Sequence, residues 1–243
     1  MNLQLQTNWS QVYVDQFVSI RKLDTPSIYS NSLEIVSILT NIPSNDELWD
    51  DMDIDELNEY INTLLWLKSE PSKNFKRIID DFEIIDINKL TFGEFLDLEY
   101  LFIDYYTNLS KICAVLYRKY KLDDWGIKRY EPYPEYDIDE RSYIFDDKYI
   151  TDIYGVIRYY LDFKDMIYKT YDLFEPELDE SDLGELDEED KIAEEQEKVY
   201  RNWGWENVLY KLSNGDITKY DDILNKPIIF IFNQLSFMKD MKI

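Results

Sequence analysis

The stretch that decides the fold reads Leu90-Thr-Phe-Gly-Glu-Phe-Leu-Asp-Leu-Glu99. Thr91 lies at the start of the apolar run, and Glu94 lies three residues after Thr91. This is the capping-box arrangement that starts a helix. The large apolar side chains after this start recur at the short spacings typical of one helical face. We therefore expect a helix that begins near residue 90 and extends to about Asp104.

Apolar residues at spacings of three and four continue along most of the chain in both directions. The chain has 243 residues but only 6 Gly and 7 Pro, too few for a β-sandwich or for the Gly-rich loops of a nucleotide-binding α/β fold. Long helices with short connections are therefore expected, with a break at Gly155. Besides 90–104, the expected helices cover residues 10–23, 33–42, 47–52, 53–68, 108–120, 147–174, 203–212, 217–224 and 227–238.

Two segments depart from the helical pattern. The runs Phe75–Ile79 and Phe82–Ile87 are rich in β-branched residues and flank Asp80-Asp81, which favours one hairpin over a helix. Residues 121–147 contain two prolines and several tyrosines, and we expect them to form a long ordered connection.

Residues 175–198 contain 13 Asp and Glu against 2 Lys and few large apolar side chains. This composition is typical of a flexible or marginally helical segment. The expected fold class is therefore mainly α, a helical domain with one small β-hairpin insertion and an acidic flexible segment. We expect an N-terminal helical unit, a hairpin with central helices, the acidic insert and C-terminal helices, packed as one compact body, over residues 1–71, 72–174, 175–198 and 199–243.

The net charge of −25 would repel both a phosphate backbone and an anionic membrane surface. We therefore expect no direct nucleic-acid binding and no membrane association. The longest apolar run, Ile228–Phe232, is far shorter than the roughly 20 residues that cross a bilayer. With a single cysteine and no leader pattern, the chain is expected to stay in a reducing cytoplasm.

The search for reactive groups predicts neither an enzyme nor a cofactor or metal protein. The chain has no His, so the usual catalytic triads and zinc patterns cannot be built. Cys113 falls on an apolar helical stripe, which favours a core position over a nucleophile. Asp50–Glu56 resembles a divalent-cation loop but lacks the central Gly and the final Glu of an EF-hand. A hydrolase with Asp and Glu metal ligands would need several acids to converge in one buried pocket, and acids interrupt the predicted apolar stripes at no more than one place.

Aromatic residues supply the candidate contact sites. Tyr130, Tyr133 and Tyr136 lie beside two prolines and could form a contact surface, although they could equally cover the helical core. Trp203 and Trp205 could be a binding anchor, since Trp dominates binding hot spots. A core position for this second group, together with Tyr200 and Tyr210, is the favoured alternative.

Four blocks in a common order resemble a family of proteins from the structural-gene regions of tailed bacteriophages that infect Bacteroidota, including crAss-like relatives. The resemblance runs from about residue 30 to residue 240, and its strength lies in the order of the blocks. The blocks are Ile35-Val-Ser-Ile-Leu-Thr-Asn-Ile-Pro43 with Asp53-Ile-Asp-Glu-Leu57, Leu90–Glu99, Leu109-Ser-Lys-Ile-Cys-Ala-Val-Leu-Tyr-Arg118, and Trp203-Gly-Trp through Asn214-Gly-Asp216.

The resemblance implies a helical assembly protein similar to tail assembly chaperones, or a packaged or connector-associated component of the virion. It implies other phage structural proteins as partners, with a homo-oligomer within the assembly as an open alternative. The implied location is the host cytoplasm during assembly, or the virion itself. A rival hypothesis of another class is an acidic DNA-mimic inhibitor, because dense carboxylates can imitate phosphates in a basic cleft.

Overall fold

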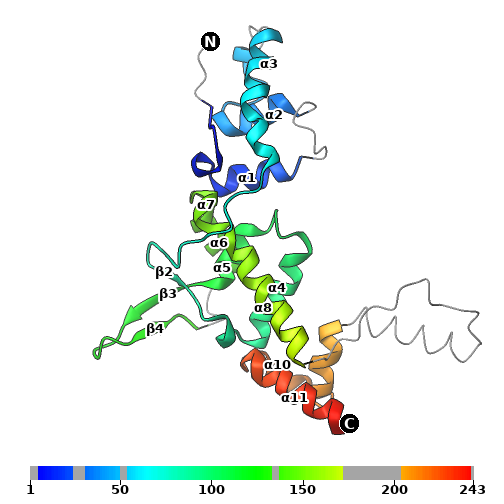
Figure 1. Cartoon of the computed structure of the whole chain (residues 1–243). Coiled ribbons are helices and arrows are strands. Elements are labelled where there is room, and N and C mark those ends of the chain that lie inside the picture. Colours follow the sequence, from blue (N-terminus) through cyan, green and yellow to red (C-terminus); the bar gives the residue numbers. More distant parts are fainter. Residues whose placement is uncertain (1–4, 24–30, 50–53, 133–136, 172–203, 242–243) are drawn as a thin grey trace, which may run out of the picture. The chain divides into compact units, whose positions relative to one another are not determined.

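The computed structural model describes residues 5–23, 31–49, 54–132, 137–171 and 204–241 (Figure 1). Its contacts divide the chain into two compact units. The first unit contains residues 1–85 and 98–162, and the second contains residues 86–97 and 163–243. Each unit therefore combines stretches that are distant in sequence. The acidic segment 175–198 lies outside the described residues.

Helices dominate the described residues, which confirms the prediction of a mainly helical chain. The expected break at Gly155 is also confirmed, because one helix ends at Ile153 and the next begins at Gly155. The α-helices are α1 (Val14–Arg21), α2 (Ser32–Thr40), α3 (Ile54–Thr63), α4 (Phe92–Leu101), α5 (Leu109–Leu116), α6 (Ile138–Asp146), α7 (Ile150–Ile153), α8 (Gly155–Tyr171), α10 (Tyr220–Leu224) and α11 (Ile228–Met241), and residues 204–212 are helical as well. The short 3-10 helices are η1 (Trp9–Gln11), η2 (Glu47–Trp49), η3 (Leu64–Lys68), η4 (Ile87–Lys89), η5 (Phe102–Asp104) and η7 (Ile217–Lys219).

Helix α5 forms the core of the first unit. Its residues Leu109, Ser110 and Ile112–Leu116 are all buried, and it packs against α1 and α6. Cys113 is fully buried on this helix, as its place in the apolar stripe predicts. Because α5 is buried in this way, it fixes the position of the chain that follows it. Strand β3 of the sheet begins there, at Tyr117.

The sheet has four antiparallel strands in sequence order: β1 (Ile78–Ile79), β2 (Phe82–Ile84), β3 (Tyr117–Leu122) and β4 (Lys128–Tyr130). The predicted hairpin is β1–β2, with Ile79 opposite Phe82 across Asp80-Asp81. Asp80 has a φ of 52°, a left-handed conformation that Asp tolerates. The sequence predicted this hairpin alone. The sheet is larger than predicted, because β3 and β4 extend it by two strands.

The expected helix 108–120 is too long, since α5 ends at Leu116 and Tyr117 is already extended. Pairing with β2 satisfies the backbone of residues 117–119 in place of helical hydrogen bonds. The expected connection 121–147 contains β4 and α6 as well. Helix α6 begins behind Asp137, whose side chain accepts hydrogen bonds from the amides of Asp139 and Glu140.

The second unit includes the start of α4, where the predicted capping box is confirmed. The Glu94 carboxylate accepts a hydrogen bond from the Thr91 amide at 2.7 Å, and the Glu94 amide donates to Thr91 Oγ1 at 3.3 Å. The amide of Phe92 donates to the Lys226 carbonyl, and that of Ile228 donates to the Leu90 carbonyl, both at 2.8 Å. The start of α4 is therefore tied to the start of α11.

Candidate functional site

The hairpin β3–β4 extends beyond the rest of the sheet in the first unit (Figure 1). The inner half of β3 pairs with β2 through Tyr117, Arg118 and Lys119. Its outer half, from Tyr120 to Leu122, pairs only with β4. Burial falls along β3 in the same direction, from buried at Tyr117 to exposed at Leu122. The outer hairpin is therefore held by its own two strands and its turn.

The turn at the end of the hairpin is ordered around Asp123. Its Oδ1 accepts hydrogen bonds from the amides of Trp125 at 3.0 Å and Ile127 at 2.9 Å. Its Oδ2 pairs with Arg129 Nε at 3.0 Å. These hydrogen bonds, led by the one from Ile127, hold the pKa of Asp123 below its ordinary value. Gly126 follows with a φ of 74°, which a glycine adopts at little cost.

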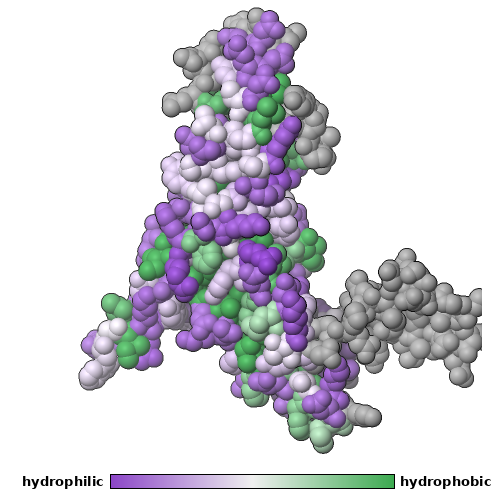
Figure 2. All heavy atoms as spheres, in the orientation of Figure 1, coloured by the Kyte–Doolittle hydropathy of each residue, from purple (hydrophilic) through white to green (hydrophobic). Residues whose placement is uncertain are grey.

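The turn presents large apolar side chains to solvent. Trp125 is 86% exposed, Leu122 62% and Ile127 53%. Figure 2 shows hydrophobic residues among hydrophilic ones on this hairpin. We call Leu122, Trp125 and Ile127 the tip residues. An ordered turn that exposes a Trp and two aliphatic side chains is typical of a surface that another molecule covers.

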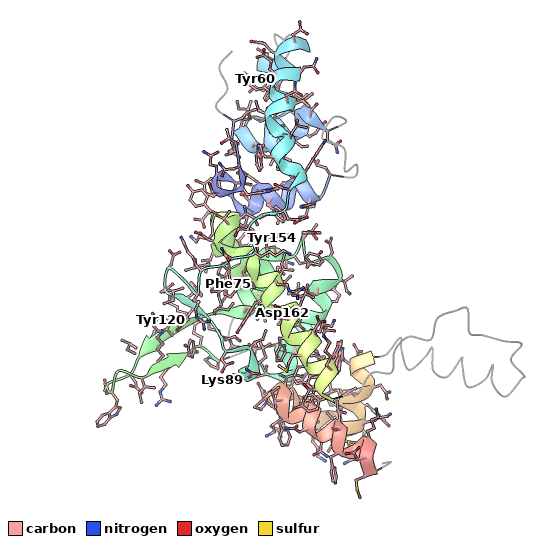
Figure 3. All side chains as sticks on the ribbon, viewed as in Figure 1. Tyr60, Phe75, Lys89, Tyr120, Tyr154 and Asp162 are labelled. Carbon is pink, nitrogen blue, oxygen red and sulfur yellow. The ribbon has the colours of Figure 1, made fainter. Side chains whose placement is uncertain are left out.

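Glu83 on β2 fastens the hairpin to the sheet. Its Oε2 accepts hydrogen bonds from Lys128 Nζ at 2.5 Å and from the Tyr130 hydroxyl at 2.8 Å. The Lys128 ammonium also lies 4.5 Å from the ring centre of Tyr120, which Figure 3 labels. The hydrogen bond from Lys128, and then that from Tyr130, lower the pKa of Glu83. This cluster fixes the direction in which the tip points.

The hairpin differs in charge from the chain as a whole. Residues 117–130 carry a net charge of +3 within a chain of net charge −25. Asp81 and Glu83 of the β1–β2 hairpin offset two of these charges and leave +1, through the pairs Lys119–Asp81 at 2.8 Å and Lys128–Glu83 at 2.5 Å. The region is therefore close to neutral, so bringing it against another protein desolvates little unpaired charge.

The structure places two of the five contact candidates. Tyr130 lies on β4, is 40% exposed, and has its hydroxyl bonded to Glu83. Trp205 belongs to the second unit, where its ring packs edge-on against Phe95 at a centroid distance of 5.1 Å and also contacts Phe92 and Phe232. Tyr133, Tyr136 and Trp203 lie outside the described residues, as do Tyr200 and residues 50–53 of the cation-loop segment.

The tip residues are absent from the contact sites predicted by the sequence. A signal for them exists, because Tyr120-Lys-Leu122 alternates between apolar and polar residues and is followed by a turn-forming stretch, Asp123-Asp-Trp-Gly126, and a short second run up to Tyr130. Reading residues 108–120 as one helix hid this hairpin. The exposure of Trp125 could not be read from its neighbours, because it depends on where the hairpin leaves the sheet.

Among the described residues, no group of three or more His, Cys, Asp or Glu is placed to hold a metal ion. No helix within that part of the chain is both long and apolar enough to cross a membrane. Burial raises the pKa of the Cys113 thiol well above its ordinary value. Comparison of the chain with protein-family models, with curated proteins and with solved structures found no match.

Proposed function

We propose that this chain is a non-catalytic protein-binding protein that places the tip of its β3–β4 hairpin in an apolar pocket of a partner. The observation that carries the proposal is Trp125, which is 86% exposed although the turn beneath it is hydrogen-bonded. Trp is the residue most enriched in binding hot spots. A partner pocket that covers it would remove a large apolar surface from water.

The magnitudes support binding through so small a surface. Burying a large apolar side chain contributes about 1.5–3 kcal/mol, and the hairpin offers three of them at Leu122, Trp125 and Ile127. Because Asp123 and Glu83 already fix the hairpin, little backbone entropy is lost on binding. The three side chains offset part of the cost of association, which is about 4–15 kcal/mol, and contacts with the rest of the hairpin supply the remainder. The result is a contact of moderate affinity, which suits a protein that binds and releases components during assembly.

The resemblance to structural-region proteins of tailed phages supports a place in particle assembly for this binding. In that setting the partners are other phage structural proteins, and the chain acts as a tail assembly chaperone in the host cytoplasm. The alternative is a packaged or connector-associated component of the virion. Mass spectrometry of purified particles separates the two, because a chaperone is absent from finished particles and a component is present at fixed stoichiometry.

The test of the hairpin uses the double variant Trp125→Ser/Ile127→Ser. We expect it to lose co-purification with phage structural proteins from infected cells, while its melting temperature stays close to that of the wild type. The matched control is Ile103→Ser on η5, a side chain that is 80% exposed but belongs to another element. This control should retain every partner. Retention of all partners by the hairpin variant would show that the tip is not the contact.

A further inference from the structure

The second unit carries a groove of about 390 Å³ beside α11. Helix α11 supplies one wall, and the ends of helix 204–212 and of α10 supply the rest. Phe230 and Phe237 line it and are still 54% and 53% exposed.

Helix α11 is apolar on two opposite faces. Ile228, Ile231 and Phe232 are buried. The ring of Phe232 stacks on that of Tyr171, with 5.4 Å between the ring centroids. Phe230, Phe237 and Met241 stand at spacings of seven and four, so they share the opposite face, where they are exposed. One apolar face is enough to hold a helix on its core, so the second face is available for another molecule.

The charge of the groove is opposite to that of the chain. Lys226 lines it beside the end of α10, and none of the described lining residues is acidic. In a chain of 51 Asp and Glu and 26 Lys and Arg, this lining favours an occupant that is both apolar and acidic. Lys226 lies just beyond the end of α10, where a cation also interacts favourably with the helix dipole. A test must therefore distinguish peptide binding from a change in stability.

We propose that this groove binds an acidic amphipathic helix of a partner protein. Phe230 and Phe237 are seven residues apart on α11 and so about 10 Å apart along its axis. That length accepts the side chains at positions i, i+3 or i+4, and i+7 of a docked helix, with a carboxylate beside Lys226. A second copy bound through the same groove would bring lysines against lysines across a two-fold axis, so self-association is disfavoured. The proposal does not depend on the hairpin.

The experiment measures fluorescence anisotropy of a labelled amphipathic peptide of about 18 residues, with Leu on one helical face and Glu on the other. A second peptide carries Lys in place of every Glu. The full-length protein should bind the Glu peptide and not the Lys peptide. Lys226→Glu should weaken binding about tenfold, and Phe237→Ser by a similar factor.

Matched controls come from the same unit. Lys169→Glu changes the net charge equally but lies outside the groove lining, and Ile217→Ser removes a side chain that is 72% exposed on η7. Both should bind the Glu peptide like the wild type. All four variants should melt within about 4 °C of the wild type, because reversing a charge at a helix end changes stability by only about 1 kcal/mol. Absence of binding up to about 1 mM, or equal binding of the Lys peptide, would overturn the proposal. So would sedimentation showing a wild-type dimer that Phe237→Ser dissociates, because the face would then be a self-interface.

Discussion

The backbone carbonyl of Lys73 occupies the space in which a side chain at Gly155 would begin. The two segments are also joined by a hydrogen bond from the Gly155 amide to the Asn74 carbonyl at 3.2 Å. Replacing Gly by Ala inside a helix normally stabilises a protein by up to about 1 kcal/mol. Here the added methyl group would meet backbone, so we expect Gly155→Ala to destabilise by about 1–3 kcal/mol, measured by urea unfolding. A gain in stability would contradict this geometry.

Gly155 also shows what the sequence can predict. The capping box of Thr91 and Glu94, the β1–β2 turn and the break at Gly155 are local features, and all three were predicted correctly. Strand β3 was not, because the pairing of Tyr117 with Ile84 joins residues 33 positions apart. Up to Tyr120, the apolar spacing fits a helix as well as a strand, so only the sheet partner decides between them.

The candidate site was only partly predictable for the same reason. Tyr130 was singled out because it belongs to a tyrosine-rich segment with prolines. Trp125 was not singled out. Its value as a contact comes from its exposure, and that exposure depends on where the hairpin leaves the sheet. The choice between core and contact for Trp205 likewise depends on Phe92, Phe95 and Phe232, which are distant in sequence and adjacent in the second unit.

We expect Trp205→Ala to destabilise the protein, because its ring packs among three Phe rings. Removing an aromatic ring from a core costs about 3–5 kcal/mol, and the partial exposure of Trp205 places the expected loss near the lower end. Thermal unfolding followed by circular dichroism measures it. Trp125→Ala is the matched comparison and should change stability by no more than about 0.5 kcal/mol. If the two variants lost equal stability, the core position of Trp205 would be wrong.

The attachment of the hairpin should weaken in acid. The pKa of Glu83 lies below its ordinary value of 4.5, first because of Lys128 and then because of Tyr130. A carboxyl group whose pKa is lower in the folded state stabilises the fold above its unfolded pKa, and this stabilisation is lost as the pH falls through the folded pKa. We therefore expect the β4 amides to lose protection from hydrogen exchange below about pH 4.5.

Glu83→Gln tests the source of that pH dependence. The variant should show weaker β4 protection at neutral pH and a smaller further loss in acid. Asp81 and Asp123, whose pKa values are also lowered, would supply the remainder. Glu59→Gln on α3 is the control, because this exposed carboxylate lies on another element. An unchanged acid response in Glu83→Gln would assign the effect to the two aspartates.

The last prediction separates the two roles open to Tyr130. Its hydroxyl is bonded to Glu83 at 2.8 Å and its ring lies 6.1 Å from that of Tyr120, so we expect it to support the hairpin and not to contact the partner itself. Tyr130→Phe keeps the ring and removes one hydrogen bond, at a cost of about 1 kcal/mol. It should therefore retain partner binding in co-purification.

Tyr130→Ser removes the ring as well and should lower both β4 protection and partner recovery. Trp125→Ser should abolish partner recovery while leaving β4 protection intact, since the amide of Trp125, and not its ring, bonds to Asp123. Comparing the amount of partner recovered with the hydrogen-exchange protection of the β4 amides therefore distinguishes a residue that supports the hairpin from one that contacts the partner. If Tyr130→Phe lost the partner while β4 stayed protected, the hydroxyl itself would be part of the contact surface, and the contact would extend from the tip to the base of the hairpin.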